Sequence, residues 1–124
     1  MKIYESGEDY LERILQLQEK QDKVISLDIA NSMNYSKPSV SRAMKNLREN
    51  GYILIDGAGV ITLTEKGYEV ASKIYERHKL ISAVLMRLGV SEENALKDAC
   101  KIEHDLSEET FNAIKKHLEE ANNK

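Results

Sequence analysis

Residues that interrupt helices are scarce in this chain, and this scarcity constrains its fold more than any other feature. The 124 residues include one proline and six glycines. The proline, Pro38, lies two residues after a serine that can cap a helix, where its missing N–H is tolerated. Two of the glycines, Gly57 and Gly59, fall between β-branched runs and predict a hairpin turn. The sequence therefore predicts a mainly α fold with a single hairpin.

Apolar residues at helical spacing predict six helices. The first is expected over about residues 7–20, and the longest from Glu65 to about Leu88. A turn at Asn34 and Tyr35 separates the second helix from the third, which ends at Gly51. The predicted N-terminal caps are Ser6, Ser26, Ser36, Thr64, Ser91 and Ser107.

The order of these elements predicts a winged helix-turn-helix followed by a second helical region. Residues 52–55 and 60–63 are expected to form the two-stranded wing. We expect the winged helix-turn-helix DNA-binding domain to span residues 1–64 and a helical dimerisation domain to span residues 65–124. The second region offers apolar faces but little core of its own, so that we expect a homodimer formed through the C-terminal helices.

Charge is distributed very unevenly along the chain. The net charge is -3, yet residues 29–48 contain no acid and four bases. Residues 91–121, in contrast, carry nine acids and four bases. A basic stripe on an acidic body is typical of a small DNA-binding protein. A helix face that is merely solvated is the alternative interpretation.

The third predicted helix has the features of a DNA-reading helix. Val40, Met44 and Leu47 recur at i, i+4 and i+7 and are expected to face the core, which leaves the basic residues outside. In a helix-turn-helix, the N-terminal residues of this helix contact base edges, and long basic side chains contact phosphates. The wing tip has no Lys or Arg and is expected to add little affinity. The predicted DNA-binding residues are Ser36, Lys37, Pro38, Ser39, Ser41, Arg42, Lys45 and Arg48.

Three side chains near the C-terminus form a candidate metal site. Cys100, Glu103 and His104 lie at i, i+3 and i+4, and therefore on one face of a helix. Thiolate, carboxylate and imidazole are suitable ligands for a divalent transition metal. The alternative is a buried cysteine beside a solvated Glu-His pair.

Further candidate ligands lie on two other predicted helices. Asp9 and Glu12 share a face of the first helix, and His78 lies on the apolar stripe of the long helix. Each has a structural alternative, because Ser6 and Asp9 have capping-box spacing and a histidine on an apolar stripe is often a core residue. Six potential ligands in three clusters nevertheless favour a metal site.

Four segments together resemble the diphtheria toxin repressor family of metal-dependent transcription factors, in particular its short, manganese-responsive branch. They are GEDYLERI, SKPSVSRAMKNLRENGYI, TLTEKGYEVASKIYERHKL and DACKIEHDLS. The resemblance extends from about Glu5 to about Leu118. It implies a winged helix joined to a helical dimerisation domain, with metal bound between them. Many iron-responsive members carry a further SH3-like domain, and we expect none here because the sequence ends at Lys124.

The resemblance also implies roles for individual residues. By position, the metal ligands would be Asp9, Glu12, His78, Cys100, Glu103 and His104. The family's reading helix would meet DNA through Ser36, Pro38, Ser39 and Arg42.

The ligand set is a hybrid of the two branches. The manganese branch has Glu at the position of Cys100, and the iron branch has Met at the position of Asp9. Ser82 and Leu96 replace two ancillary ligands of the iron branch, which weakens an iron-type second site. The short form favours Mn²⁺, whereas the soft thiolate favours Fe²⁺, with Co²⁺ or Zn²⁺ as further options.

These features predict a cytoplasmic repressor of metal homeostasis that binds a palindromic operator in double-stranded DNA when divalent metal is present. The alternative is a winged-helix regulator that responds to a small molecule or to oxidation of Cys100. An enzyme is not expected, although Cys-x-x-Glu-His loosely resembles an inverted zinc-peptidase pattern. The N-terminus lacks the apolar run of a signal peptide, and no membrane span is expected.

Overall fold

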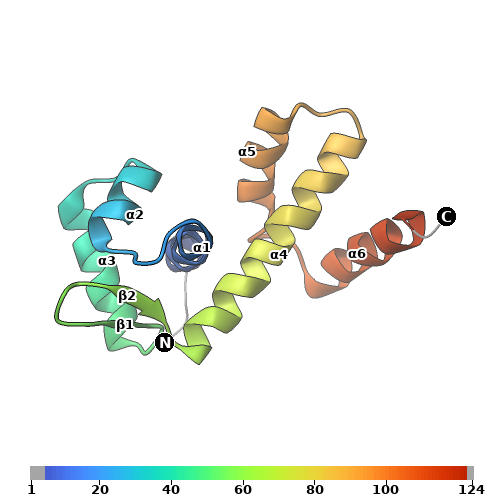
Figure 1. Cartoon of the computed structure of the whole chain (residues 1–124). Helices are drawn as coiled ribbons and strands as arrows, with labels where there is room; N and C mark the ends of the chain where they lie inside the picture. The colour runs from blue at the N-terminus through green and yellow to red at the C-terminus, as the bar shows by residue number, and fades with distance from the viewer. Residues whose placement is uncertain (1–4, 123–124) are drawn as a thin grey trace. The chain divides into compact units, whose positions relative to one another are not determined.

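The computed structural model describes residues 5–122 and divides into two compact units, each considered by itself (Figure 1). Unit 1 comprises residues 1–73 and unit 2 comprises residues 74–124. The chain order is α1(Glu5–Lys20), α2(Ser26–Met33), α3(Lys37–Glu49), β1(Ile53–Ile55), β2(Ile61–Leu63), α4(Glu65–Arg87), α5(Glu92–Ile102) and α6(Glu108–Asn122). The predicted fold class, mainly α with a two-stranded wing, is confirmed. The domain boundary after residue 64 stays a prediction.

The core of unit 1 joins its three helices to the hairpin. Leu11 and Ile14 of α1 are fully buried, as is Ile29 of α2. The predicted inner face of α3 is confirmed, because Val40, Met44 and Leu47 are all buried. One apolar cluster thus fixes α3 and leaves its polar face exposed.

Local signals in the sequence set both ends of α3. Ser36 is the N-cap, and its Oγ accepts the N–H of Ser39 at 3.3 Å. At the other end, Gly51 adopts a left-handed φ of 82°. The N–H of Tyr52 then reaches back to the carbonyl of Leu47 at 3.0 Å, which is the Schellman arrangement that favours glycine.

Two predicted caps are wrong. The helix α1 already includes Glu5, so that Ser6 lies inside its first turn. The N-cap of α2 is Ile25, whose N–H donates to the Asp28 carboxylate at 2.9 Å, and Ser26 is the first helical residue. A charged acceptor three residues into the helix thus replaces the serine hydroxyl.

The wing is an antiparallel pair in the register Ile53↔Leu63, Leu54↔Thr62 and Ile55↔Ile61. The carboxylate of Asp56 closes the turn, since it accepts the N–H groups of Ala58 and Val60, each at 2.9 Å.

The first turn of α4 is packed tightly against the end of the α3–β1 connection. Thr64 Oγ1 donates to the carbonyl of Gly51 at 2.6 Å and accepts the N–H of Gly67 at 3.1 Å. A Cβ on Gly67 would overlap the carbonyl oxygen of Tyr52, so that only glycine allows this approach. These contacts hold the start of α4 to the wing within unit 1.

Unit 2 contains the rest of α4 with α5 and α6. The predicted caps of the last two helices are confirmed, because Ser91 accepts from the N–H of Asn94 and Ser107 from that of Thr110. Ile81, Phe111 and Leu118 are buried, together with the small side chains of Ala95 and Ala99. No helix among residues 5–122 has the length and apolar character needed to cross a membrane.

Candidate functional site

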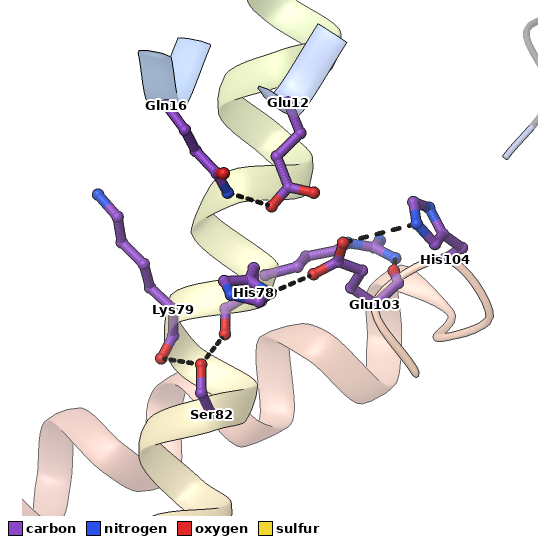
Figure 2. Close-up of polar contacts among 8 residues, drawn as sticks. Glu12, Gln16, His78, Lys79, Ser82, Glu103 and His104 are labelled. Carbon is purple, nitrogen blue, oxygen red and sulfur yellow. Dashed lines mark hydrogen bonds and ion pairs between the residues drawn. The ribbon is translucent and has the colours of Figure 1, made fainter. Parts of the chain in front are cut away.

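Glu103 lies between two imidazole rings in unit 2 (Figure 2). Its Oε2 is 3.0 Å from Nδ1 of His78, and its Oε1 is 3.5 Å from Nε2 of His104. The side chain of Glu103 is fully buried. A buried carboxylate is costly unless positively charged or hydrogen-bonding groups surround it, and here two imidazoles face it.

The thiol of Cys100 joins this cluster. One ligand atom each from His78, Cys100 and Glu103 can be chosen so that all lie within 4.8 Å of one another. Nitrogen, sulfur and oxygen donors at this spacing suit one divalent transition ion. The residues present therefore fit a metal, and we define His78, Cys100, Glu103 and His104 as the unit 2 cluster.

Two helices and a turn position the unit 2 cluster. His78 lies within α4, while Cys100 lies in the last turns of α5. Glu103 is the C-cap of α5 and still has helical dihedral angles, with its N–H on the carbonyl of Ala99 at 3.0 Å. His104 follows in the turn after the helix, so that the prediction of one helix face holds for Cys100 and Glu103 only.

The burial of these residues contradicts the structural alternative for the C-terminal triple. That alternative required a buried cysteine beside a solvated Glu-His pair. In the structure Cys100 is exposed, Glu103 is fully buried, and the side chain of His104 is only 3% exposed. The carboxylate and this imidazole therefore lie inside and not on a solvated face.

Neither ancillary position of the iron branch carries a strong metal ligand. Ser82 is buried, and its hydroxyl donates to the main-chain carbonyl of His78 within the same helix. Leu96 is apolar and exposed.

The two remaining candidate ligands belong to unit 1. Asp9 and Glu12 lie on α1, where Asp9 is half-buried and Glu12 is buried. Gln16 donates to the carboxylate of Glu12 at 3.3 Å (Figure 2). Because Ser6 lies inside α1, the capping-box interpretation of Asp9 is wrong. A site that includes both residues and the unit 2 cluster stays a prediction from the sequence.

The predicted DNA-binding residues gather at one end and one face of α3. Ser39 is half-buried, and its Oγ is 2.8 Å from that of Ser36 and 3.5 Å from Nη2 of Arg42. The other seven are exposed: Ser36, Lys37, Pro38, Ser41, Arg42, Lys45 and Arg48. An exposed basic face that begins at a helix N-terminus is suited to contact with the DNA backbone and base edges.

An aromatic contact connects α1 to the start of α3. The rings of Tyr10 and Tyr35 meet edge to face, with centroids 6.0 Å apart. Burial raises the pKa of Tyr10 above its usual value, and the neighbouring Tyr35 adds to this shift. Tyr10 therefore stays neutral at physiological pH.

Among the described residues, Arg77 is a buried polar residue that the sequence patterns did not predict. It lies in α4 three residues after Ile74 and four before Ile81, and both of these are buried. An arginine on an apolar stripe was the available signal, but its partners are 26 and 29 residues away in sequence.

Family comparisons match nearly the whole chain. Residues 2–58 match the family described as "Iron dependent repressor, N-terminal DNA binding domain". Residues 64–123 match "Iron dependent repressor, metal binding and dimerisation domain".

Relatives that match most of the chain are transcriptional regulators by name. An uncharacterised HTH-type transcriptional regulator from Methanocaldococcus jannaschii is 38% identical over 122 residues, which cover 97% of this chain and 98% of the relative. The HTH-type transcriptional regulator MntR of Geobacillus kaustophilus is 35% identical over 109 residues, covering 88% and 75% respectively.

The same fold occurs in a solved structure of the manganese regulator SloR. The TM-score is 0.81 at 33% identity, and the match covers 91% of this chain. The chain spans about half the length of that protein, since 53% of it is covered.

Proposed function

Because the chain belongs to the family of iron-dependent repressors, we propose that it represses transcription through DNA binding that requires a divalent metal ion held partly by the unit 2 cluster. Members of this family are manganese- or iron-dependent transcriptional repressors with an N-terminal DNA-binding domain and a C-terminal metal-binding and dimerisation domain. We assign the metal ligands and the DNA contacts to individual residues of this chain.

One observation carries the assignment of the metal site. A fully buried carboxylate, Glu103, has an imidazole nitrogen near each of its oxygens, at 3.0 and 3.5 Å, and a thiol within 4.8 Å. Gathering carboxylate, imidazole and thiol groups together is unfavourable for an apolar core, but these three kinds of donor suit a transition metal ion.

We assign the rest of the ligand set to Asp9 and Glu12 of α1. Their support is the family match over both regions, the i, i+3 spacing and the failure of the capping explanation for Asp9. With them the set contains carboxylate, imidazole and thiolate groups from Asp9, Glu12, His78, Cys100, Glu103 and His104.

In this mechanism, a site shared by Asp9, Glu12 and Glu103 would place three carboxylates together, and their repulsion without metal would favour a loosened α1. A divalent ion, when bound there, would supply the positive charge that offsets this repulsion. α1 is coupled to the reading helix inside unit 1, because Tyr10 packs on Tyr35, which directly precedes the N-cap of α3. Restraint of α1 therefore restrains α3, provided that the metal binds the DNA-competent state more tightly than the other states.

The same mechanism predicts what the protein binds. A homodimer formed through the C-terminal helices presents two copies of α3 to a palindromic operator, with half-sites about 34 Å apart or a multiple of this distance. We assign base-edge contacts to the N-terminal part of α3 and phosphate contacts to Lys45 and Arg48. The protein then acts in the cytoplasm and has no catalytic role.

The physiological metal depends on two features that point in different directions. The manganese-named relatives favour Mn²⁺, and the thiolate of Cys100 favours Fe²⁺ or another soft ion such as Co²⁺ or Zn²⁺. We propose that the site accepts both Mn²⁺ and Fe²⁺.

Substitution of the central carboxylate tests the proposal. Glu103→Ala is expected to abolish metal-stimulated DNA binding while the helical fold survives. The measurement is the affinity for a DNA fragment selected by the wild-type protein, with Mn²⁺ and with a chelator, alongside circular dichroism. Glu103→Gln, which retains the shape of the buried side chain, should show the same loss.

The matched control removes an exposed carboxylate from the same helix. Glu93 of α5 pairs with Lys97 at 3.3 Å on the surface, and Glu93→Ala should leave metal-stimulated binding unchanged. Full metal stimulation in Glu103→Ala would refute the site. Metal-independent but specific DNA binding by the wild type would favour the regulator that senses a small molecule or an oxidant through Cys100.

A further inference from the structure

Arg77 holds the segment that carries two of the candidate ligands. Its Nη1 donates to the main-chain carbonyl of Glu103 at 3.1 Å and to that of Leu106 at 2.7 Å. Its guanidinium also lies over the ring of Phe111, 5.2 Å from the centroid. Arg77 is 6% exposed, so that these contacts are largely shielded from water.

Consecutive residues of α4 thus contact the same segment in different ways. His78 contacts the side chain of Glu103, and Arg77 contacts its main chain. The last carbonyls of a helix have no partners within the helix, and a cation at this end is favourable. Arg77 therefore fixes the end of α5 and the turn that contains His104.

We propose that Arg77 is a positioning residue of the metal site, which holds Glu103 and His104 against α4 before metal binds. The proposal rests on the proposed function, since it assumes that the unit 2 cluster binds metal. A ligand set that is already held in place loses less conformational freedom on binding, and its affinity is therefore higher. Residues that orient metal ligands typically contribute about 10- to 100-fold to metal affinity.

Stability alone does not distinguish this role from simple packing. The Nε of Arg77 is buried and has no hydrogen-bond partner among the described residues, so that removing the guanidinium relieves the desolvation penalty of this group. Removal also takes the Nη1 hydrogen bonds from the carbonyls of Glu103 and Leu106, which lowers stability. Metal affinity and the ligand environment of the bound ion are the informative quantities.

The test is a titration of the purified full chain with Co²⁺, whose visible absorption reports coordination geometry and thiolate ligation. Arg77→Met retains the apolar stem and removes the donors, and is expected to weaken Co²⁺ binding by about 10- to 100-fold and to change the spectrum. Arg77→Lys retains the charge without the planar fork and should fall between Arg77→Met and the wild type.

The matched control is Lys79→Met, two residues further along α4. Lys79 is an exposed cation whose Nζ lies over the ring of Tyr75, 3.9 Å from the centroid, and its substitution should leave affinity and spectrum unchanged. Wild-type affinity and spectrum in folded Arg77→Met would overturn the proposal. If that variant does not fold, Arg77→Lys decides: weaker binding supports the role, and equal binding refutes it.

The wild-type titration separates metal binding by the unit 2 cluster from the positioning role of Arg77. A wild type that binds Co²⁺, with loss of binding in Glu103→Ala, supports the unit 2 cluster whatever the Arg77 variants do. A wild type that binds no Co²⁺ overturns the metal site and the positioning role together.

Discussion

Cys100 is the residue that most distinguishes the proposed metal site from a manganese site made only of oxygen and nitrogen donors. It lies within 4.8 Å of donor atoms on His78 and Glu103, and it is exposed. A thiolate binds soft ions better than Mn²⁺, which prefers carboxylate oxygen. In the proposed site, the choice of metal therefore depends mainly on this one side chain.

Replacement of the Cys100 sulfur should change the affinity of the site for Mn²⁺ relative to Co²⁺. Cys100→Glu is expected to shift preference toward Mn²⁺ over Co²⁺ by about tenfold, which corresponds to about 1.4 kcal/mol. The measurement is competition between the two ions under anaerobic conditions. Lys101→Glu places a similar carboxylate one residue further on and should cause no shift. Unchanged relative affinities in Cys100→Glu would mean that Cys100 is not a ligand.

At the scale of elements, α3 combines a buried apolar face with an exposed basic one. Arg42 lies one turn after Pro38 and is exposed, with Nη2 3.5 Å from Ser39 Oγ. Arg42→Ala is expected to weaken DNA binding by about 1–3 kcal/mol if it contacts a base, or to lower the salt slope by about one if it contacts a phosphate. Titrations of DNA at several salt concentrations, with metal affinity measured in parallel, provide the test.

A cation outside α3 serves as the control for Arg42. Lys20, exposed at the end of α1, should tolerate substitution by Ala with little change in affinity. Operator affinity and salt slope that are unchanged in Arg42→Ala would contradict the assignment of α3. Metal affinity should stay constant in both variants.

Sequence patterns predict some features of these elements and miss others. Ser36, Ser91 and Ser107 were predictable caps because each bonds to an N–H three residues away. Ser26 is not a cap, because the carboxylate of Asp28 accepts the N–H of Ile25, which is the N-cap in its place.

Other contacts join residues that are distant in sequence, and the periodicity of apolar residues does not detect them. Examples are the close approach of Gly67 to Tyr52 and the bonds from Arg77 to Glu103 and Leu106.

At the scale of the whole molecule, charge and metal binding are complementary. The chain has a net charge of -3, yet residues 29–48 carry four bases and no acid. A basic segment attracts DNA while the net negative charge of the rest of the chain opposes its approach, so that binding depends on the correct presentation of the basic segment. A requirement for metal would allow the ion to control how the two copies of α3 in a dimer are presented to DNA.

The most direct test is the retention of fragmented genomic DNA on the immobilised protein, with a chelator and with Mn²⁺ or anaerobic Fe²⁺. The proposed function predicts that a few discrete fragments are retained only when metal is present. Specific retention regardless of metal would contradict the role of the unit 2 cluster in DNA binding. Absence of specific retention under every condition would contradict the function itself.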